Sequence, residues 1–344
     1  MKISCKQYEL ELKHPFSISK FTRTSTPLLL LKINYEGFNG YGEASMVPYM
    51  GENYTSAHSF LAKVDWSRFI HPFDFSEIHQ YLDSLESGNP AVKAAIDIAL
   101  NDLNGKILNQ PCYQIFGSNP AKMPVTSYTV GIDTPEVIRE KLKDAADFKV
   151  IKVKLGRDND KELINTIRSV TNLPLFVDAN QGWTDRKQAI EMCYWLHDQG
   201  VLLIEQPMDK NNLDGNAWLT GRSPIPIIAD EAVQRIADLD NLRGAYHGIN
   251  IKLMKSAGMY EAQQMILKAR SFGMKILIGC MSETSIATLA GIALAPQCDW
   301  ADLDGPSLTK NNPFNDPEIK EGKYVLNDLP GLGLIGGDEE LFVI

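Results

Sequence analysis

Short aliphatic segments recur along the chain from about Pro124 onward, and most of the sequence between them is amphipathic. They follow one another at intervals of roughly 22 to 27 residues, which is the spacing of βα units in a parallel barrel. They begin near Val125, Val150, Leu175, Leu202, Ile227, Ile249 and Ile276, and a last short one covers Trp300–Leu303. Apolar residues at helical spacing predict helices between them, including Lys161–Val170, Arg186–Gln199 and Met259–Phe272. The pattern favours an α/β barrel over an open doubly wound sheet, because the glycine-rich first turn typical of such a sheet is absent.

The first part of the chain has a different pattern, in which strands precede helices in blocks. Strands are expected at Lys2–Leu12, Pro27–Tyr35 and Tyr41–Ala44, with a break at Pro15-Phe16-Ser17 between the first two. Helices are expected at Thr55–Val64, Ser76–Ser84 and Pro90–Asn104. We therefore predict an α+β domain over residues 1–120 and a barrel over residues 121–312. The Gly/Pro-rich tail, residues 313–344, is expected to return to the N-terminal domain.

Composition excludes several classes of partner. The hydrophobic content of 44% is that of a soluble globular protein, and the net charge of −9 without a basic run argues against a nucleic-acid partner. The N-terminus lacks the apolar core of a signal peptide, and the apolar run Leu28–Leu31 is too short to span a membrane. The five cysteines are scattered without a CxxC spacing, so we expect a reduced, cytoplasmic protein.

Charged residues lie at the predicted C-terminal ends of the strands, which meet at one mouth in a parallel barrel. The clearest case is the strand Val150–Gly156, where two lysines at alternate positions must point to the same face. Burying two like charges together is costly unless an anionic or catalytic partner is present. The residues at the strand ends are Lys152, Lys154, Asp178, Glu205, Asp230, Lys252, Asp302 and Asp304.

Three carboxylates on successive strands form an oxygen-rich site suited to one Mg²⁺ ion. Zinc is not indicated, since no histidine pair has ligand spacing. The strands that carry Lys154 and Lys252 should face each other across the ring. Metal charge and the neighbouring Lys152 favour a neutral amine at Lys154, so one lysine can remove a proton α to a carboxylate. The metal would stabilise the resulting enolate, and the other lysine can return the proton.

The motifs Lys152-Val153-Lys154, Asp178-Ala179-Asn180, Glu205-Gln206-Pro207, Ala229-Asp230-Glu231 and Lys252 resemble those of the enolase superfamily, in the branch that contains muconate lactonising enzyme. The resemblance covers nearly the whole chain and implies a (β/α)7β modified TIM barrel with an N-terminal α+β capping domain completed by the C-terminal tail. Within that branch, Ile278-Gly279-Cys280-Met281 and Asp302-Leu303-Asp304-Gly305-Pro306 look like the corresponding segments of dipeptide epimerases.

The resemblance implies a role for each site residue. Lys154 and Lys252 would be the acid/base pair, and Lys152 would neutralise the substrate carboxylate. The Mg²⁺ ligands would be Asp178, Glu205 and Asp230, with Asn180 and Glu231 in supporting positions. Asp302 and Asp304 would bind the α-ammonium group of a dipeptide, a cationic end that two carboxylates suit. Thr129, Cys280 and Ser282 would line the substrate.

The function implied is a Mg²⁺-dependent epimerase that inverts the second residue of Ala-Xaa dipeptides, in a protein that forms homo-oligomers as its relatives commonly do. Glutamate-specific members use a basic residue in the first capping loop, and Arg23 lies in that region. Its spacing does not align cleanly, so a small or apolar second residue is favoured and Glu remains an alternative. The alternative hypotheses for the function are an o-succinylbenzoate synthase, an N-acylamino acid racemase, and a ligand-binding barrel without catalysis.

Taken singly, these residues also have plainer explanations. A Lys-x-Lys pair is usually solvated, and Asp178 or Asp230 could cap a helix. Asp302 and Asp304 could close a turn, Cys280 could be a small core residue, and Arg23 could be a surface charge. Lys255 is expected to form a surface ion pair. The functional interpretation depends on their occurring together at one face of one barrel.

Overall fold

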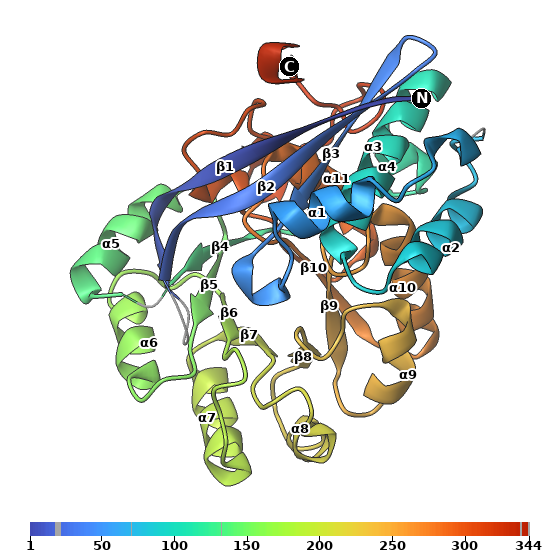
Figure 1. Ribbon diagram of the computed structural model, residues 1–344. Helices are drawn as coiled ribbons and strands as arrows, with labels where there is room; N and C mark the ends of the chain where they lie inside the picture. Colours follow the sequence, from blue (N-terminus) through green and yellow to red (C-terminus); the bar gives the residue numbers. More distant parts are fainter. Residues whose placement is uncertain (18–21, 70, 132, 338, 343–344) are drawn as a thin grey trace.

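Eight parallel strands form a nearly closed barrel in the computed structural model, which describes residues 1–17, 22–69, 71–131, 133–337 and 339–342 (Figure 1). The strands, in order around the sheet, are β4 (Ser127–Val130), β5 (Val150–Lys154), β6 (Leu175–Asp178), β7 (Val201–Glu205), β8 (Ile227–Ala229), β9 (Gly248–Lys252), β10 (Lys275–Gly279) and β11 (Trp300–Asp302). A bridge between Thr126 and Ala301 joins the two ends of the sheet. The prediction of a barrel rather than an open sheet is confirmed.

Helices follow the strands and surround the barrel (Figure 1). They are α5 (Pro135–Asp144), α6 (Asp160–Arg168), α7 (Arg186–Asp198), α8 (Leu213–Thr220), α9 (Leu239–Leu242), α10 (Met259–Ser271) and α11 (Ser285–Leu294). Most are amphipathic, and α7 shows why they start where they do: the Asp185 side chain accepts hydrogen bonds from the backbone of Lys187 and Gln188. Helix α11 differs because all of its residues are buried.

The interior of the barrel below the mouth is filled by apolar side chains. One cluster consists of residues that are at most 2% exposed, namely Val150, Phe176, Leu203, Ile228 and Leu277. Each comes from a different strand, and side chains two residues apart on a strand share a face. The residues two positions further along these strands therefore point into the same interior, at its C-terminal end.

An antiparallel sheet lies beside the barrel, formed by β1 (Lys2–Ser17), β2 (Thr22–Tyr35) and β3 (Phe38–Ser45). The helices that accompany it are α1 (Tyr54–Leu61), α2 (Phe75–Leu85), α3 (Pro90–Leu108) and α4 (Cys112–Ile115). Helix α3 packs directly on β3 at two glycines, where a Cβ on Gly40 or Gly42 would collide with the helix backbone. These are the strands and helices expected of the α+β capping part.

Strand β1 is longer than the sequence pattern indicated. It continues through Pro15-Phe16-Ser17, where we expected a break, although its register with β2 shifts between Glu11 and Phe16. The reason is that β1 is an edge strand of its sheet, and an edge position tolerates a proline that cannot donate a hydrogen bond. At the other end of the chain, β11 ends at Asp302, one residue before the predicted boundary.

The C-terminal tail returns to the N-terminal part, as predicted. It forms a small hairpin, β12 (Ile319–Lys320) and β13 (Lys323–Tyr324), before it reaches α3 and β3. The backbone of Leu332 donates to Asp102 of α3, and the Phe342 ring lies 5.5 Å from that of Tyr41. Domain boundaries at residues 120 and 312 stay a prediction.

None of the helices in the described part of the chain has the length and apolar character needed to span a membrane.

Candidate active site

Strand register aligns the predicted site residues at the barrel mouth. Lys154 pairs with Asp178 across β5 and β6, and Asp178 pairs with Glu205 across β6 and β7. On the other side of the ring, Gly279 of β10 pairs with both Lys252 of β9 and Asp302 of β11. The structure thus brings residues that are far apart in sequence to one level of the barrel, at the C-terminal ends of the strands.

Asp178, Glu205 and Asp230 form a compact acidic triad. Each offers a carboxylate oxygen, and the three oxygens lie within 4.8 Å of one another. Asp178 and Glu205 are fully buried, and Asp230 is 5% exposed. Burial and the nearby Asp178 raise the pKa of Glu205 to about 7, because its charged form is disfavoured away from water and beside another carboxylate. A divalent cation would offset that repulsion, and the all-oxygen donor set fits one Mg²⁺ ion.

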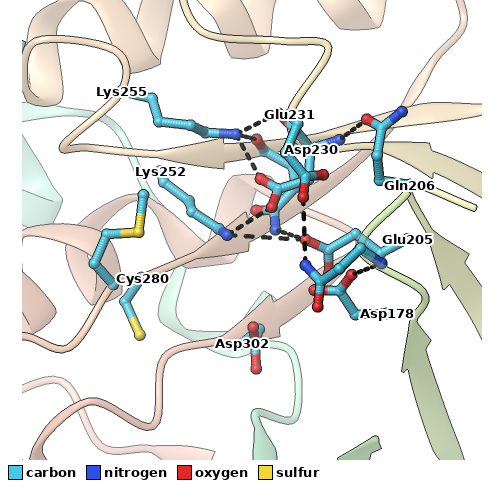
Figure 2. Close-up of polar contacts among 12 residues, drawn as sticks. Asp178, Glu205, Gln206, Asp230, Glu231, Lys252, Lys255, Cys280 and Asp302 are labelled. Atoms are coloured by element: carbon cyan, nitrogen blue, oxygen red, sulfur yellow. Dashed lines mark hydrogen bonds and ion pairs between the residues drawn. The ribbon is translucent and has the colours of Figure 1, made fainter. Parts of the chain in front are cut away.

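Three lysines of β5 and β9 surround the triad, and the nearest triad carboxylate is a different one for each. The Nζ atom of Lys154 lies 2.6 Å from Asp178 Oδ2, and that of Lys252 lies 2.8 Å from Asp230 Oδ2. The Nζ atom of Lys152 lies 2.7 Å from Glu205 Oε2. Figure 2 shows Lys252 reaching toward Asp230 and Glu205 from the β9 side of the site. Lys154 and Lys252 therefore flank the triad from β5 and β9.

Lys152 is enclosed more completely than the other two lysines. It is 1% exposed and, besides Glu205, contacts Asp302 Oδ2 at 2.6 Å and Asp178 Oδ2 at 3.7 Å. Burial disfavours its charged form, but these three carboxylates together raise the pKa of Lys152 well above its usual range. Lys152 is thus a fixed ammonium group between the triad and Asp302.

Asp302 and Asp304 lie side by side at the end of β11, in different environments. Asp302 receives a hydrogen bond from Ser127 Oγ at 2.6 Å. Burial acts to raise the pKa of this carboxyl, but the nearby Lys152 ammonium outweighs burial and lowers it. Asp304 receives a hydrogen bond from the backbone of Thr129 at 2.6 Å, while burial and Asp302 raise its pKa to about 7. Two neighbouring buried carboxyl groups are suited to binding a cationic group.

A cavity of about 460 Å³ lies over these residues. Its walls include Lys152, Lys154, Asp230, Lys252, Thr129, Cys280, Ser282, Asp302 and Asp304. The capping part contributes Arg23, Tyr49 and Met50 to the same cavity, and Arg23 Nη2 donates to Ser282 Oγ at 2.8 Å. Residues 18–21 of the first capping loop lie outside the described residues. Asp178 and Glu205 are fully buried and do not line the cavity. They contact Lys154 and Lys152, which do line it.

Two residues at the site were not assigned a role there from the sequence. Lys255 was expected on the surface but is 3% exposed, and its Nζ lies 2.6 Å from Asp230 Oδ1. The reason is that the turn after β9 directs it back over the barrel mouth. Asn250 is fully buried and donates to Glu205 Oε1 at 2.8 Å. A signal for Asn250 exists, because it stands two positions before Lys252 on one strand and so shares its face.

Comparison with known proteins agrees with this architecture. Residues 2–117 match the mandelate racemase/muconate lactonizing enzyme N-terminal domain, and residues 136–338 match the enolase C-terminal domain-like family. An eight-stranded barrel with an acidic triad and flanking lysines at its mouth defines an enolase-superfamily enzyme. The chain belongs to the mandelate racemase/muconate lactonizing enzyme family of that superfamily, and it is an isomerase.

Individual relatives resemble the chain over nearly its whole length. It is 52% identical over 336 residues to an L-Ala-D/L-Glu epimerase from Bacteroides thetaiotaomicron, covering 97% of this chain and 88% of the relative. The solved structure of a substrate-liganded L-Ala-D/L-Glu epimerase from Bacillus subtilis has a TM-score of 0.90 at 28% sequence identity. The match covers 98% of this chain and 99% of that structure's chain. The structure of a dipeptide epimerase from Enterococcus faecalis V583, in complex with Mg and the dipeptide L-Leu-L-Tyr, has a TM-score of 0.87 at 30% sequence identity. The match covers 97% of this chain and 99% of that structure's chain.

Proposed function

We propose that this enzyme is a Mg²⁺-dependent dipeptide epimerase that inverts the α-carbon of the second residue by proton transfer between two lysines. One observation carries the proposal: Lys154 and Lys252 flank the acidic triad from β5 and β9, each within 2.8 Å of a different triad carboxylate. Inversion at one carbon needs an acid/base group on each face of the substrate, and we assign Lys154 and Lys252 to these two roles.

In this mechanism, one lysine starts as a neutral amine and takes the α-proton from one face. The other starts as an ammonium group and donates its proton to the opposite face, so the configuration is reversed. Mg²⁺, held by Asp178, Glu205 and Asp230, supplies positive charge that stabilises the negative charge developing on the substrate carboxylate. Lys152 stays charged beside it and adds to that stabilisation. The reverse reaction uses the same two lysines with exchanged protonation states.

The remaining contacts of a dipeptide are assigned by charge. We assign Asp302 and Asp304, which line the cavity, to binding of its α-ammonium group, which an N-acylated amino acid does not have. Thr129, Cys280 and Ser282 are assigned to the wall around the substrate. This assignment disfavours both o-succinylbenzoate synthase and N-acylamino acid racemase activity, since neither substrate offers a cation to the Asp302–Asp304 pair.

We further propose that Glu is preferred as the second residue, so that the substrate is L-Ala-D/L-Glu. The supporting observation is Arg23, which lines the cavity and is oriented by Ser282. Burial lowers the pKa of Arg23, but a guanidinium group stays charged, and in a partly desolvated wall it favours a carboxylate ligand. The relative at 52% identity is itself named an L-Ala-D/L-Glu epimerase. The alternative from the sequence, a small or apolar second residue, is compared directly in the test.

The test is incubation with Mg²⁺ in D₂O of L-Ala-L-Glu, L-Ala-L-Val and N-succinyl-L-Glu, followed by NMR. Deuterium should enter the α-carbon of Glu with racemisation there only, and kcat/KM should fall for L-Ala-L-Val. Arg23→Met should reduce that difference. Exchange of the N-succinyl compound without exchange of any L-Ala dipeptide would contradict the epimerase assignment, as would turnover of a cyclohexadiene carboxylate alone.

We propose that the enzyme is cytoplasmic. All five cysteines are free, which agrees with a reducing cytoplasm. We propose one Mg²⁺ ion per subunit and a homo-oligomeric assembly. Size-exclusion chromatography with light scattering measures the number of subunits in the assembly. Metal analysis of the purified protein measures the number of Mg²⁺ ions per subunit.

A further inference from the structure

The two oxygens of each triad carboxylate have different partners. One oxygen of each faces a lysine: Asp178 Oδ2 faces Lys154, Glu205 Oε2 faces Lys152, and Asp230 Oδ2 faces Lys252. The second oxygen of each accepts a hydrogen bond from another group, although Glu205 Oε1 also lies 3.9 Å from Lys252 Nζ. The same division occurs at all three carboxylates, although the three donors differ in chemistry.

The donors to the second oxygens are all fixed by the fold. The backbone of Asn180, in a left-handed conformation with φ of 43°, donates to Asp178 Oδ1 at 2.9 Å. The Asn250 side chain donates to Glu205 Oε1 at 2.8 Å. Gly279 beside it leaves room for this amide, since a Cβ there would come within 2.6 Å of Asn250 Oδ1.

Lys255 holds the third carboxylate most firmly. Its Nζ donates to Asp230 Oδ1 at 2.6 Å, to the Asp230 carbonyl at 2.7 Å and to the Asn250 carbonyl at 3.2 Å. All three protons of the ammonium group are thus used, and the side chain is buried. Figure 2 shows Lys255 and Lys252 reaching Asp230 from the same side. Because the two backbone carbonyls hold the ammonium group in place, its contact with Asp230 Oδ1 in turn fixes the orientation of the carboxylate.

We propose that Asn250 and Lys255 are positioning residues that restrict Glu205 and Asp230 to one metal-binding oxygen each, and so select Mg²⁺ over Ca²⁺. Mg²⁺ requires octahedral geometry with short bonds and accepts single oxygens from carboxylates, with water completing its shell. Ca²⁺ takes six to eight oxygens and gains from bidentate carboxylates. Holding the second oxygen of each ligand on a protein donor removes the bidentate option and leaves the Mg²⁺ arrangement intact.

The test is the ratio of Ca²⁺ to Mg²⁺ dissociation constants of the metal-free protein, measured by calorimetry without dipeptide. Lys255→Met and Asn250→Ala should each lower this ratio about tenfold, chiefly because Ca²⁺ binds more tightly when a carboxylate becomes bidentate. Lys255→Arg keeps a charged donor to Asp230 and should restore much of the ratio. Lys268→Met removes a partly exposed lysine whose Nζ lies 2.7 Å from Asp240 Oδ2, away from the triad, and it is the matched control.

The ratio separates geometry from charge. If Lys255→Met strengthens or weakens both ions by the same factor, Lys255 acts only through its charge or through folding, and the proposal is wrong. An unchanged ratio in Asn250→Ala overturns it equally, and this neutral variant decides the matter if Lys255→Met does not fold. Neither result depends on which dipeptide the enzyme uses, so failure here leaves the epimerase assignment open to its own test.

Discussion

The interior of the barrel has two layers built on the same strands. The lower layer is apolar and consists of Val150, Phe176, Leu203, Ile228 and Leu277. The upper layer stands two residues further along each strand, at Lys152, Asp178, Glu205, Asp230 and Gly279. Both layers are buried, and both follow from the alternation of side chains along a strand.

The two layers differ in what burial does to the protein's stability. Each apolar side chain of the lower layer gains free energy on leaving water, on the order of 1.5–3 kcal/mol. The charged groups of the upper layer lose hydration, and pairing offsets that loss without clearly exceeding it. The lower layer therefore stabilises the barrel, whereas the upper layer places charges where a substrate and a metal ion can use them.

Removing either proposed acid/base lysine should produce the largest loss of activity. Lys154→Ala and Lys252→Ala should each lower kcat for epimerisation by about 10³-fold or more, because general acid–base catalysis supplies a factor of that order. One-sided proton exchange in D₂O, starting from each epimer separately, checks whether a single lysine serves each face. If either variant epimerises at the wild-type rate, the two-lysine mechanism is wrong.

Truncation in the lower layer should affect stability and leave the chemistry intact. Leu203→Ala should lower the free energy of unfolding by about 2–5 kcal/mol, because it leaves a cavity in a close-packed layer. Its neighbour Leu202 is 42% exposed on the other face of β7, so Leu202→Ala should cost no more than about 0.5 kcal/mol. Urea unfolding of both variants gives the comparison. Equal losses would contradict the assignment of the two faces.

Mg²⁺ binding at the upper layer should stabilise the folded protein against unfolding. Mg²⁺ at 100 times its dissociation constant should raise the free energy of unfolding by about 2.7 kcal/mol, since it binds only the folded triad. Removing the ion with EDTA should abolish activity, and added Mg²⁺ should restore it. The same titration on Asp230→Asn should give a much smaller increment. A full increment in that variant would place the stabilising ion elsewhere.

A buried carboxyl outside the triad should give the smallest effect. Glu283 accepts a hydrogen bond from the Met281 backbone, and burial and Glu43 raise its pKa from 4.5 to about 8. Between these two values the folded state binds more protons than the unfolded state, so stability should fall as pH rises from 4.5 to 8. Glu283→Gln should reduce that fall by about 1 kcal/mol or more. Urea unfolding at several pH values with Mg²⁺ present is the measurement, and an unchanged pH slope in the variant would contradict it.

The sequence predicted the barrel because each βα unit carries its own periodic signal, and the strand ends then follow from chain order. It also predicted which residues meet at the mouth, since parallel strands in register place their C-terminal ends together. The β1 segment was less accurate: Pro15 indicates a break, and only the edge position of β1 in its sheet makes that proline tolerable.

The sequence alone therefore determined the kind of chemistry available: carboxylates for a metal ion, lysines on opposite strands, and an acidic pair beyond them. The tertiary structure decided which oxygen meets which nitrogen. Lys255 turns inward to Asp230, and Arg23 meets a serine 259 positions away. Such contacts depend on loop direction and side-chain packing between distant segments. Local periodicity carries no information about either, so they become visible only when the chain is folded.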